Sequence, residues 1–192
     1  MATSLRERKK IQTRTAIRRA ALELFSERGY ADTAIDQIAA AADVSPRTFY
    51  RYFGVKEAVL LSDDHIAPIV AAFAEAPADL TIVAAYRHAV AKVFGALTPA
   101  EREDAEAGQR LMYEVPAAQG LVYAEYIRLI GMIADAMAHR PDAPSDPLER
   151  RVIAGAIVGV LIAASHRTPM PDDALAASLT ILDARLSEPQ PS

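Results

Sequence analysis

The sequence of 192 residues predicts an all-α protein, with an N-terminal domain of three short helices followed by a larger C-terminal helical bundle. Apolar residues recur with the helical period, as in the stripe formed by Ile17, Ala20, Ala21, Leu24 and Phe25. No segment alternates β-branched and aromatic residues between turn pairs, which is the pattern typical of strands. Prolines and capping residues also mark several helix starts.

Composition excludes several classes of protein. Hydrophobic residues make up 52% of the chain, which excludes a disordered protein. Cysteine is absent, which excludes disulfides, thiol chemistry and zinc fingers and predicts a reducing, cytoplasmic setting. Residues 1–19 are polar and basic, so we expect no signal peptide. No apolar run is long enough to predict a membrane span.

Charge is distributed unevenly along a chain whose formal net charge is −4. Up to Phe53 there are ten lysines and arginines against six acidic residues, whereas the remainder has eleven against nineteen. A basic segment ahead of an acidic one indicates a part that faces nucleic acid, attached to a body with another task. Basic N-termini are also common without nucleic-acid binding, so charge alone leaves both interpretations open.

The first helix is expected to end at Gly29, because glycine is the usual residue just past a helix C-terminus. The tetrad Thr33–Asp36 resembles a capping box that begins a second, short helix. The residues of this helix expected to face inward are Ile35, Ile38 and Ala39. Residues 41–44 then predict a tight break.

The segment after this break predicts a third helix with two distinct faces. Ser45 suits the N-cap and Pro46 the first helical position, and the helix should end before Gly54. One face carries Phe49 and Phe53, one turn apart, which we expect to pack on the first two helices through Phe25, Ile35 and Ile38. The opposite face carries Arg47, Tyr50 and Arg51.

A short helix, a tight turn and a second short helix form the helix-turn-helix pattern. Arg47, in the first turn of the recognition helix, suits bidentate contact with guanine, and Tyr50 suits a thymine methyl or a phosphate. Contacts to the DNA backbone are predicted for Thr33, Tyr52 and Lys56. A purely structural role stays open for Thr33, Arg51, Tyr52 and Lys56.

Longer helices are predicted beyond this region. Their expected ranges are 56–76, 80–97, 98–115, 119–139, 146–165 and 172–186, with a proline-rich loop over 140–147. The tetrad Thr98–Glu101 combines an N-cap, a first-turn proline and a glutamate at N3, and Asp146–Glu149 follows the same logic. The 119–139 helix is apolar nearly all round, which predicts neighbours on both sides.

The last two helices predict a dimer interface. Residues 152–165 carry no charge, and Gly155 and Gly159 would allow close approach of another helix. The leucines that form a seam with 4-3-4 spacing are Leu175, Leu179, Leu182 and Leu186. We expect a homodimer through helices near 147–166 and 172–187. The alternative is that these helices only close the core of the monomer.

The stretch TRTAIRRAALELFSERGYADTAIDQIAAAADVSPRTFYRYFGVKEAVL, from Thr13 to Leu60, resembles the DNA-binding domain of the TetR family of transcriptional regulators. Pattern and resemblance together give the candidate DNA-binding residues Thr33, Ser45, Pro46, Arg47, Thr48, Tyr50, Arg51, Tyr52 and Lys56. Ala34 departs from members of the family that place a base-reading side chain at this position. The departure shifts more of the expected readout to Arg47 and Tyr50.

The resemblance implies a DNA-binding domain over 1–56 and an effector-binding and dimerisation domain over 57–192. A basic arm over 1–12 reaches the minor groove in some members of the family and not in others. The resemblance further implies a homodimeric repressor that leaves a palindromic operator in double-stranded DNA when a small hydrophobic effector binds. Activation in place of repression stays open.

The middle helices combine apolar residues with scattered polar ones, as expected of a site for a hydrophobic effector. The candidate effector-binding residues are Phe73, Tyr86, His88, Phe94, Arg110, Tyr113, Tyr123 and Tyr126. The run SPRTFYRYFGVKEAVLLSDD is also similar to a TetR subgroup whose effectors resemble long-chain acyl-CoA. Arg110 or Arg128 could meet an anionic head group or pair with a nearby glutamate.

Two other functions were weighed against this one. An enzyme is not expected, because the chain has no glycine-rich phosphate loop, nucleophile elbow or CxxC motif. The histidines are His65, His88, His139 and His166, and none forms a metal-binding pair, so no metal or cofactor is expected. A DNA-binding regulator without a small-molecule ligand is the remaining alternative.

Overall fold

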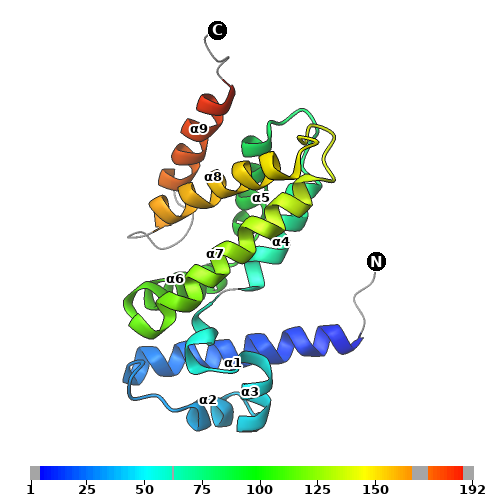
Figure 1. Cartoon of the computed structure of the whole chain (residues 1–192). Coiled ribbons are helices and arrows are strands. Elements are labelled where there is room, and N and C mark those ends of the chain that lie inside the picture. Colours follow the sequence, from blue (N-terminus) through cyan, green and yellow to red (C-terminus); the bar gives the residue numbers. More distant parts are fainter. Residues whose placement is uncertain (1–4, 62, 166–172, 188–192) are drawn as a thin grey trace. The chain divides into compact units, whose positions relative to one another are not determined.

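The computed structural model describes residues 5–61, 63–165 and 173–187 of the chain (Figure 1). All regular elements in these ranges are helices, as the sequence predicts. They are α1 (Leu5–Arg28), α2 (Ile35–Ala41), α3 (Pro46–Phe53), the 3-10 helix η1 (Lys56–Leu60), α4 (Asp63–Ala74), α5 (Ile82–Gly95), α6 (Pro99–Glu114), α7 (Pro116–Met137), α8 (Pro147–Ser165) and α9 (Asp173–Ser187). In the described ranges, none of the helices has both the length and the apolar character to cross a membrane.

The chain divides into two compact units. The first unit consists of Met1–Leu61 and Ala107–Leu121, and the second consists of Ser62–Glu106 and Val122–Ser192. The helices α6 and α7 therefore contribute residues to both units. The assignment of residues 1–56 to DNA binding and 57–192 to effector binding and dimerisation is a functional division, and it stays a prediction.

One apolar core holds the first unit together. Its buried members are Ile17, Ala21, Leu22, Leu24 and Phe25 of α1, Ile38 of α2, Phe49 and Phe53 of α3, Val59 and Leu60 of η1, and Val115 and Ala118 at the corner between α6 and α7. The predicted inward face of α3 is confirmed by this core. Burying a large apolar side chain stabilises a fold by about 1.5–3 kcal/mol, so these residues fix how α1, α2 and α3 pack.

Side-chain caps explain where several helices begin. The hydroxyl of Ser45 accepts a hydrogen bond from the backbone N–H of Thr48 at 3.2 Å. Thr98 and Glu101 cap each other's backbone N–H groups, at 2.9 and 3.3 Å, and these bonds from Thr98 lower the pKa of Glu101. A carboxylate oxygen of Asp146 accepts from the N–H of Leu148 at 3.0 Å. All three caps were predicted from the sequence.

Two predicted helix boundaries are wrong. α2 begins at Ile35 with Ala34 as its N-cap, and the side chain of Gln37 accepts from the N–H of Ala34 at 2.9 Å. Thr33 cannot act as the predicted cap, because its hydroxyl bonds back toward α1. The predicted helix 56–76 is two elements, η1 and α4, with Leu61 extended after η1. The break falls where the chain passes from the first unit to the second.

The second unit is a bundle around its own apolar core. α4 packs along α5, and α9 packs against both α5 and α8. Arg87 of α5 donates a hydrogen bond to Thr180 of α9, and Thr81 donates to Asp183 at 2.6 Å. The largest fully buried side chains of this core are Phe73 of α4, Val83 of α5, Ile133 and Met137 of α7, Ile157 and Val158 of α8, and Leu179 of α9.

Two predictions about the outer surfaces of this bundle need correction. Leu175 and Leu179 are buried in the core of the unit, so they cannot form a seam facing a partner. The periodicity identified the leucine face of α9 correctly, but α5 and α8 cover that face within the chain. The helix predicted over 119–139 is not covered on both sides, because Tyr123 is 69% exposed and Ile127 is also exposed on α7.

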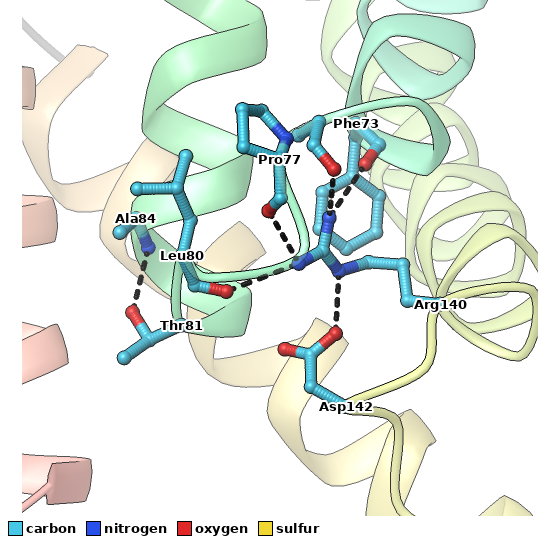
Figure 2. Close-up of polar contacts among 8 residues, drawn as sticks. Phe73, Pro77, Leu80, Thr81, Ala84, Arg140 and Asp142 are labelled. Atoms are coloured by element: carbon cyan, nitrogen blue, oxygen red, sulfur yellow. Dashed lines mark hydrogen bonds and ion pairs between the residues drawn. The ribbon is translucent and has the colours of Figure 1, made fainter.

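A buried arginine joins three parts of the second unit. Arg140 follows α7, and its guanidinium points into the loop between α4 and α5 (Figure 2). Its Nη1 donates to the carbonyls of Phe73 and Ala76 at 3.3 and 3.0 Å, and Nη2 donates to those of Pro77 and Leu80 at 3.3 and 3.0 Å. Nε donates to the carboxylate of Asp142 at 2.9 Å. All five N–H groups of the guanidinium are thereby used.

Replacement of Arg140 should destabilise the second unit strongly. Arg140→Leu would leave four carbonyls and a carboxylate without donors, so we expect the free energy of unfolding to fall by about 2–4 kcal/mol. Urea unfolding followed by circular dichroism measures this change. Arg151→Leu is the matched control, because Arg151 is exposed on α8. Equal unfolding midpoints for the two variants would contradict the role given to Arg140.

Candidate nucleic-acid interface

The turn between α2 and α3 is tight and depends on one residue with positive φ. Asp43 has φ of 53°, in the left-handed region that asparagine, aspartate and glycine tolerate best. The N–H of Val44 donates to the carbonyl of Ala39 at 2.9 Å, and the N–H of Asp43 donates to that of Ala40 at 3.2 Å. The end of α2 is thereby closed, and the chain is directed into Ser45 and α3.

Two buried rings fix the rotation of α3. Phe49 and Phe53 are packed with ring centroids 5.5 Å apart, and both lie in the core of the first unit. Because side chains four residues apart share one helix face, the opposite face must point away from that core. Arg47, Tyr50 and Arg51 are exposed, and Tyr50 keeps 52% of its surface accessible.

We define the α3 face as the exposed residues Ser45, Pro46, Arg47, Tyr50 and Arg51. Thr48 and Tyr52 flank it and are half-buried. Thr48 lies 3.0 Å from the Ser45 hydroxyl, and the guanidinium of Arg51 lies 5.2 Å from the ring centroid of Tyr52. Seven of the nine predicted DNA-binding residues therefore gather on one short helix and its N-cap.

The other two predicted residues, Thr33 and Lys56, are engaged inside the first unit. Thr33 is 1% exposed, and its hydroxyl donates toward the carbonyls of Gly29 and Leu24 at 2.8 and 3.3 Å. The ammonium of Lys56 donates to the carbonyls of Tyr30 and Thr33 at 2.8 and 2.9 Å and lies 4.2 Å from the Tyr30 ring centroid. In this structure both side chains hold the loop ahead of α2.

Sequence reasoning missed Arg14 of α1. Its Nη1 donates to the carbonyl of Tyr52 at 3.3 Å, and its guanidinium lies 4.7 Å from the centroid of the Phe53 ring. Carbonyls in the last turn of a helix have no partner within the helix, so this bond helps to fix the C-terminal end of α3. The basic character of α1 was visible in the sequence, but the contact joins residues 38 positions apart.

The predicted effector-binding residues divide between the two units. Phe73 and Tyr86 are buried in the core of the second unit, and Phe94 and Tyr126 pack against it partly buried. His88 and Tyr123 are exposed, and Arg110 and Tyr113 belong to the first unit. The structure thus brings together four of the eight. Arg128 pairs with Glu125, with 3.0 Å between Nε and each carboxylate oxygen.

A tight turn followed by a short helix with an exposed basic and aromatic face defines a helix-turn-helix protein, a class that reads double-stranded DNA. Comparison with family models gives the same class. The model "Bacterial regulatory proteins, tetR family" matches residues 17–62, and the model "MftR C-terminal domain" matches residues 80–189. The chain belongs to the TetR family of DNA-binding transcriptional regulators.

Two curated relatives support this placement. The HTH-type transcriptional regulator TcmR of Streptomyces glaucescens is 40% identical over 130 residues, which cover 65% of this chain and 56% of the relative. The regulator MftR of Mycobacterium tuberculosis is 25% identical over 146 residues, which cover 75% of this chain and 73% of the relative. The chain therefore spans little more than half the length of TcmR.

Solved structures show the shared fold. Thermus thermophilus FadR, a TetR-family repressor in complex with lauroyl-CoA, matches with a TM-score of 0.54 and 23% identity over 93% of this chain and 99% of that chain. A TetR-family regulator from Streptomyces coelicolor matches with a TM-score of 0.54 and 19% identity over 93% and 96% of the two chains.

Loss of Lys56 should weaken the first unit itself. Lys56→Ala removes the donor of two carbonyls, so we expect the free energy of unfolding to fall by about 1–3 kcal/mol, measured by urea unfolding. Lys92→Ala, on the exposed side of α5, serves as the control. If Lys56→Ala weakened DNA binding without any change in unfolding, the ammonium would act on phosphate alone and the positioning role would be wrong.

Proposed function

We propose that this chain is a ligand-responsive transcriptional repressor that binds a palindromic operator as a homodimer and leaves it when a hydrophobic effector binds. The observation that carries the proposal is the α3 face, a basic and aromatic surface held outward by two buried phenylalanines. Because bacterial DNA lies in the cytoplasm, the regulator would act there.

The α3 face supports a division of labour between base reading and backbone contact. Arg47 is the second residue of α3, in the turn that enters the major groove first. Its guanidinium suits bidentate contact with guanine, and Tyr50 suits a thymine methyl. Arg51, Tyr52 and Thr48 lie where they would meet sugar and phosphate. Ser45 and Pro46 would set the tip of the helix against the groove.

Exposed apolar side chains support dimerisation through α8 and α9. The large apolar residues that stay exposed on these helices are Leu148, Val152, Ile162, Ile181 and Leu186. Such a surface costs free energy in water and is typical of an interface. A two-fold axis between two chains would give two α3 faces that read an inverted repeat. The buried Leu175 and Leu179 would support this surface from inside.

The core of the second unit supports an apolar effector. Phe73 and Tyr86 lie in it, and Phe94 and Tyr126 line its edge. The structural neighbour FadR is described in complex with lauroyl-CoA, which agrees with the acyl-CoA-like effector expected from the sequence. An effector that binds better to a dimer with the wrong separation of α3 faces would release DNA. Inverting a 99:1 equilibrium requires about 5.5 kcal/mol of differential binding.

Arg47→Ala should abolish discrimination between operator and random DNA. We expect the operator affinity to fall by about 1–3 kcal/mol while binding to random DNA changes little, because a base contact is lost and the backbone contacts remain. Fluorescence anisotropy with both DNAs at several salt concentrations measures the two affinities. Arg19→Ala is the control, because Arg19 is exposed on α1 beside Glu23. Equal losses on both DNAs would show that Arg47 does not read bases.

Ile181→Glu should convert the dimer to a monomer. Ile181 is 64% exposed on α9, and a buried glutamate at a symmetric interface would face its own copy. Sedimentation velocity at micromolar concentration measures the state of association. Ile127→Glu is the matched control, an equally exposed type of side chain on α7. A monomeric wild-type protein, or monomers from both variants, would contradict the proposed interface.

A further inference from the structure

Tyr86 is a polar side chain buried in an apolar core. It lies on α5, is 2% exposed, and its ring packs edge-on against Phe73 with 5.9 Å between centroids. The other buried residues of this core are apolar side chains from α4, α5, α7, α8 and α9, among them Ile69, Val90 and Ile133. The phenol is therefore surrounded by groups that offer its hydroxyl no acceptor.

Within the described residues, the hydroxyl of Tyr86 makes no hydrogen bond, and burial is the sole cause of the upward shift of its pKa. The group is therefore neutral at physiological pH and keeps an unused O–H donor. A buried donor without an acceptor is unfavourable, and native proteins leave few of them. An acceptor that arrives with a bound molecule would satisfy it.

The same core has no free positive charge to hold an anion. Among the described residues of the second unit, Arg140 is the buried charged side chain. Its five N–H groups already donate to four carbonyls and to Asp142, as Figure 2 shows. An ionised group taken into this core would lose its hydration without gaining a partner, which is strongly unfavourable.

We propose that the O–H of Tyr86 donates to a carbonyl-type acceptor on the part of the effector that enters this core, and that this part is uncharged. The inference rests on the proposed function, because it assigns chemistry to the effector of that function. Two sources share this chemistry. One is a small neutral ketone or ester, and the other is an acyl-CoA thioester whose charged end stays outside the core.

The first test examines the protein without ligand. Tyr86→Phe removes a hydroxyl that has no partner, so the urea midpoint of the variant should equal or exceed that of the wild type. A lower midpoint would show that the hydroxyl makes a structural hydrogen bond, and it would overturn the proposal. This readout separates a ligand-recognition role from a purely structural one, and it depends on no assumption about the ligand.

The second test uses two probes of one shape, 9-fluorenone with a carbonyl and fluorene without it. Titration calorimetry should give about 3- to 10-fold tighter binding of fluorenone to the wild type, and a ratio near one for Tyr86→Phe. An unchanged ratio in the variant overturns the proposal, as does failure of both probes to bind. Fluorene-9-carboxylate should bind more weakly than either probe, and tighter binding of this anion also contradicts an uncharged site.

Lauroyl-CoA distinguishes the two sources. Competition with fluorenone, together with a 3- to 10-fold loss in Tyr86→Phe, identifies the thioester as the acceptor. Absence of competition from lauroyl-CoA, with the fluorenone preference intact, identifies a small neutral effector. If these molecules release operator DNA equally well from wild type and Tyr86→Phe, the role of Tyr86 fails while the proposed repressor function stands.

Discussion

The burial of Phe49 and Phe53 is the constraint on which the DNA-facing surface depends. The two rings lie one turn apart in the core of the first unit, so α3 has one orientation and its other face must point outward. Ser45 fixes the start of the helix, and Arg14 bonds to its end. The reading of DNA by Arg47 would thus depend on a helix held at its base and at both ends, which limits the freedom lost on binding.

Buried polar groups are used differently in the two parts of the chain. Thr33 and Lys56 bond to the loop ahead of α2, and Arg140 bonds to the loop after α4, so each holds chain segments that have no regular structure. Tyr86 differs because its hydroxyl lies in an apolar core without such a partner. That contrast between satisfied and unsatisfied groups is what separates a structural residue from a candidate binding residue.

Local features were predictable from the sequence, and contacts between distant segments were not. The caps at Ser45 and Thr98 involve neighbours three residues away, and the apolar period gave the inward face of α3. The bonds of Arg14 and Lys56 join residues 38 and 23 to 26 positions apart, so no local pattern reveals them. Periodicity likewise identified the leucine face of α9 without showing that α5 and α8 cover it.

The central claim is that two copies of the α3 face read one DNA site. Sequencing of random DNA fragments that the purified wild-type protein retains tests it most directly. The account predicts enrichment of an inverted repeat, with guanines at symmetric positions in both half-sites where Arg47 would enter the major groove. Retention of fragments without any shared sequence, or enrichment of a single unrepeated site, would contradict it.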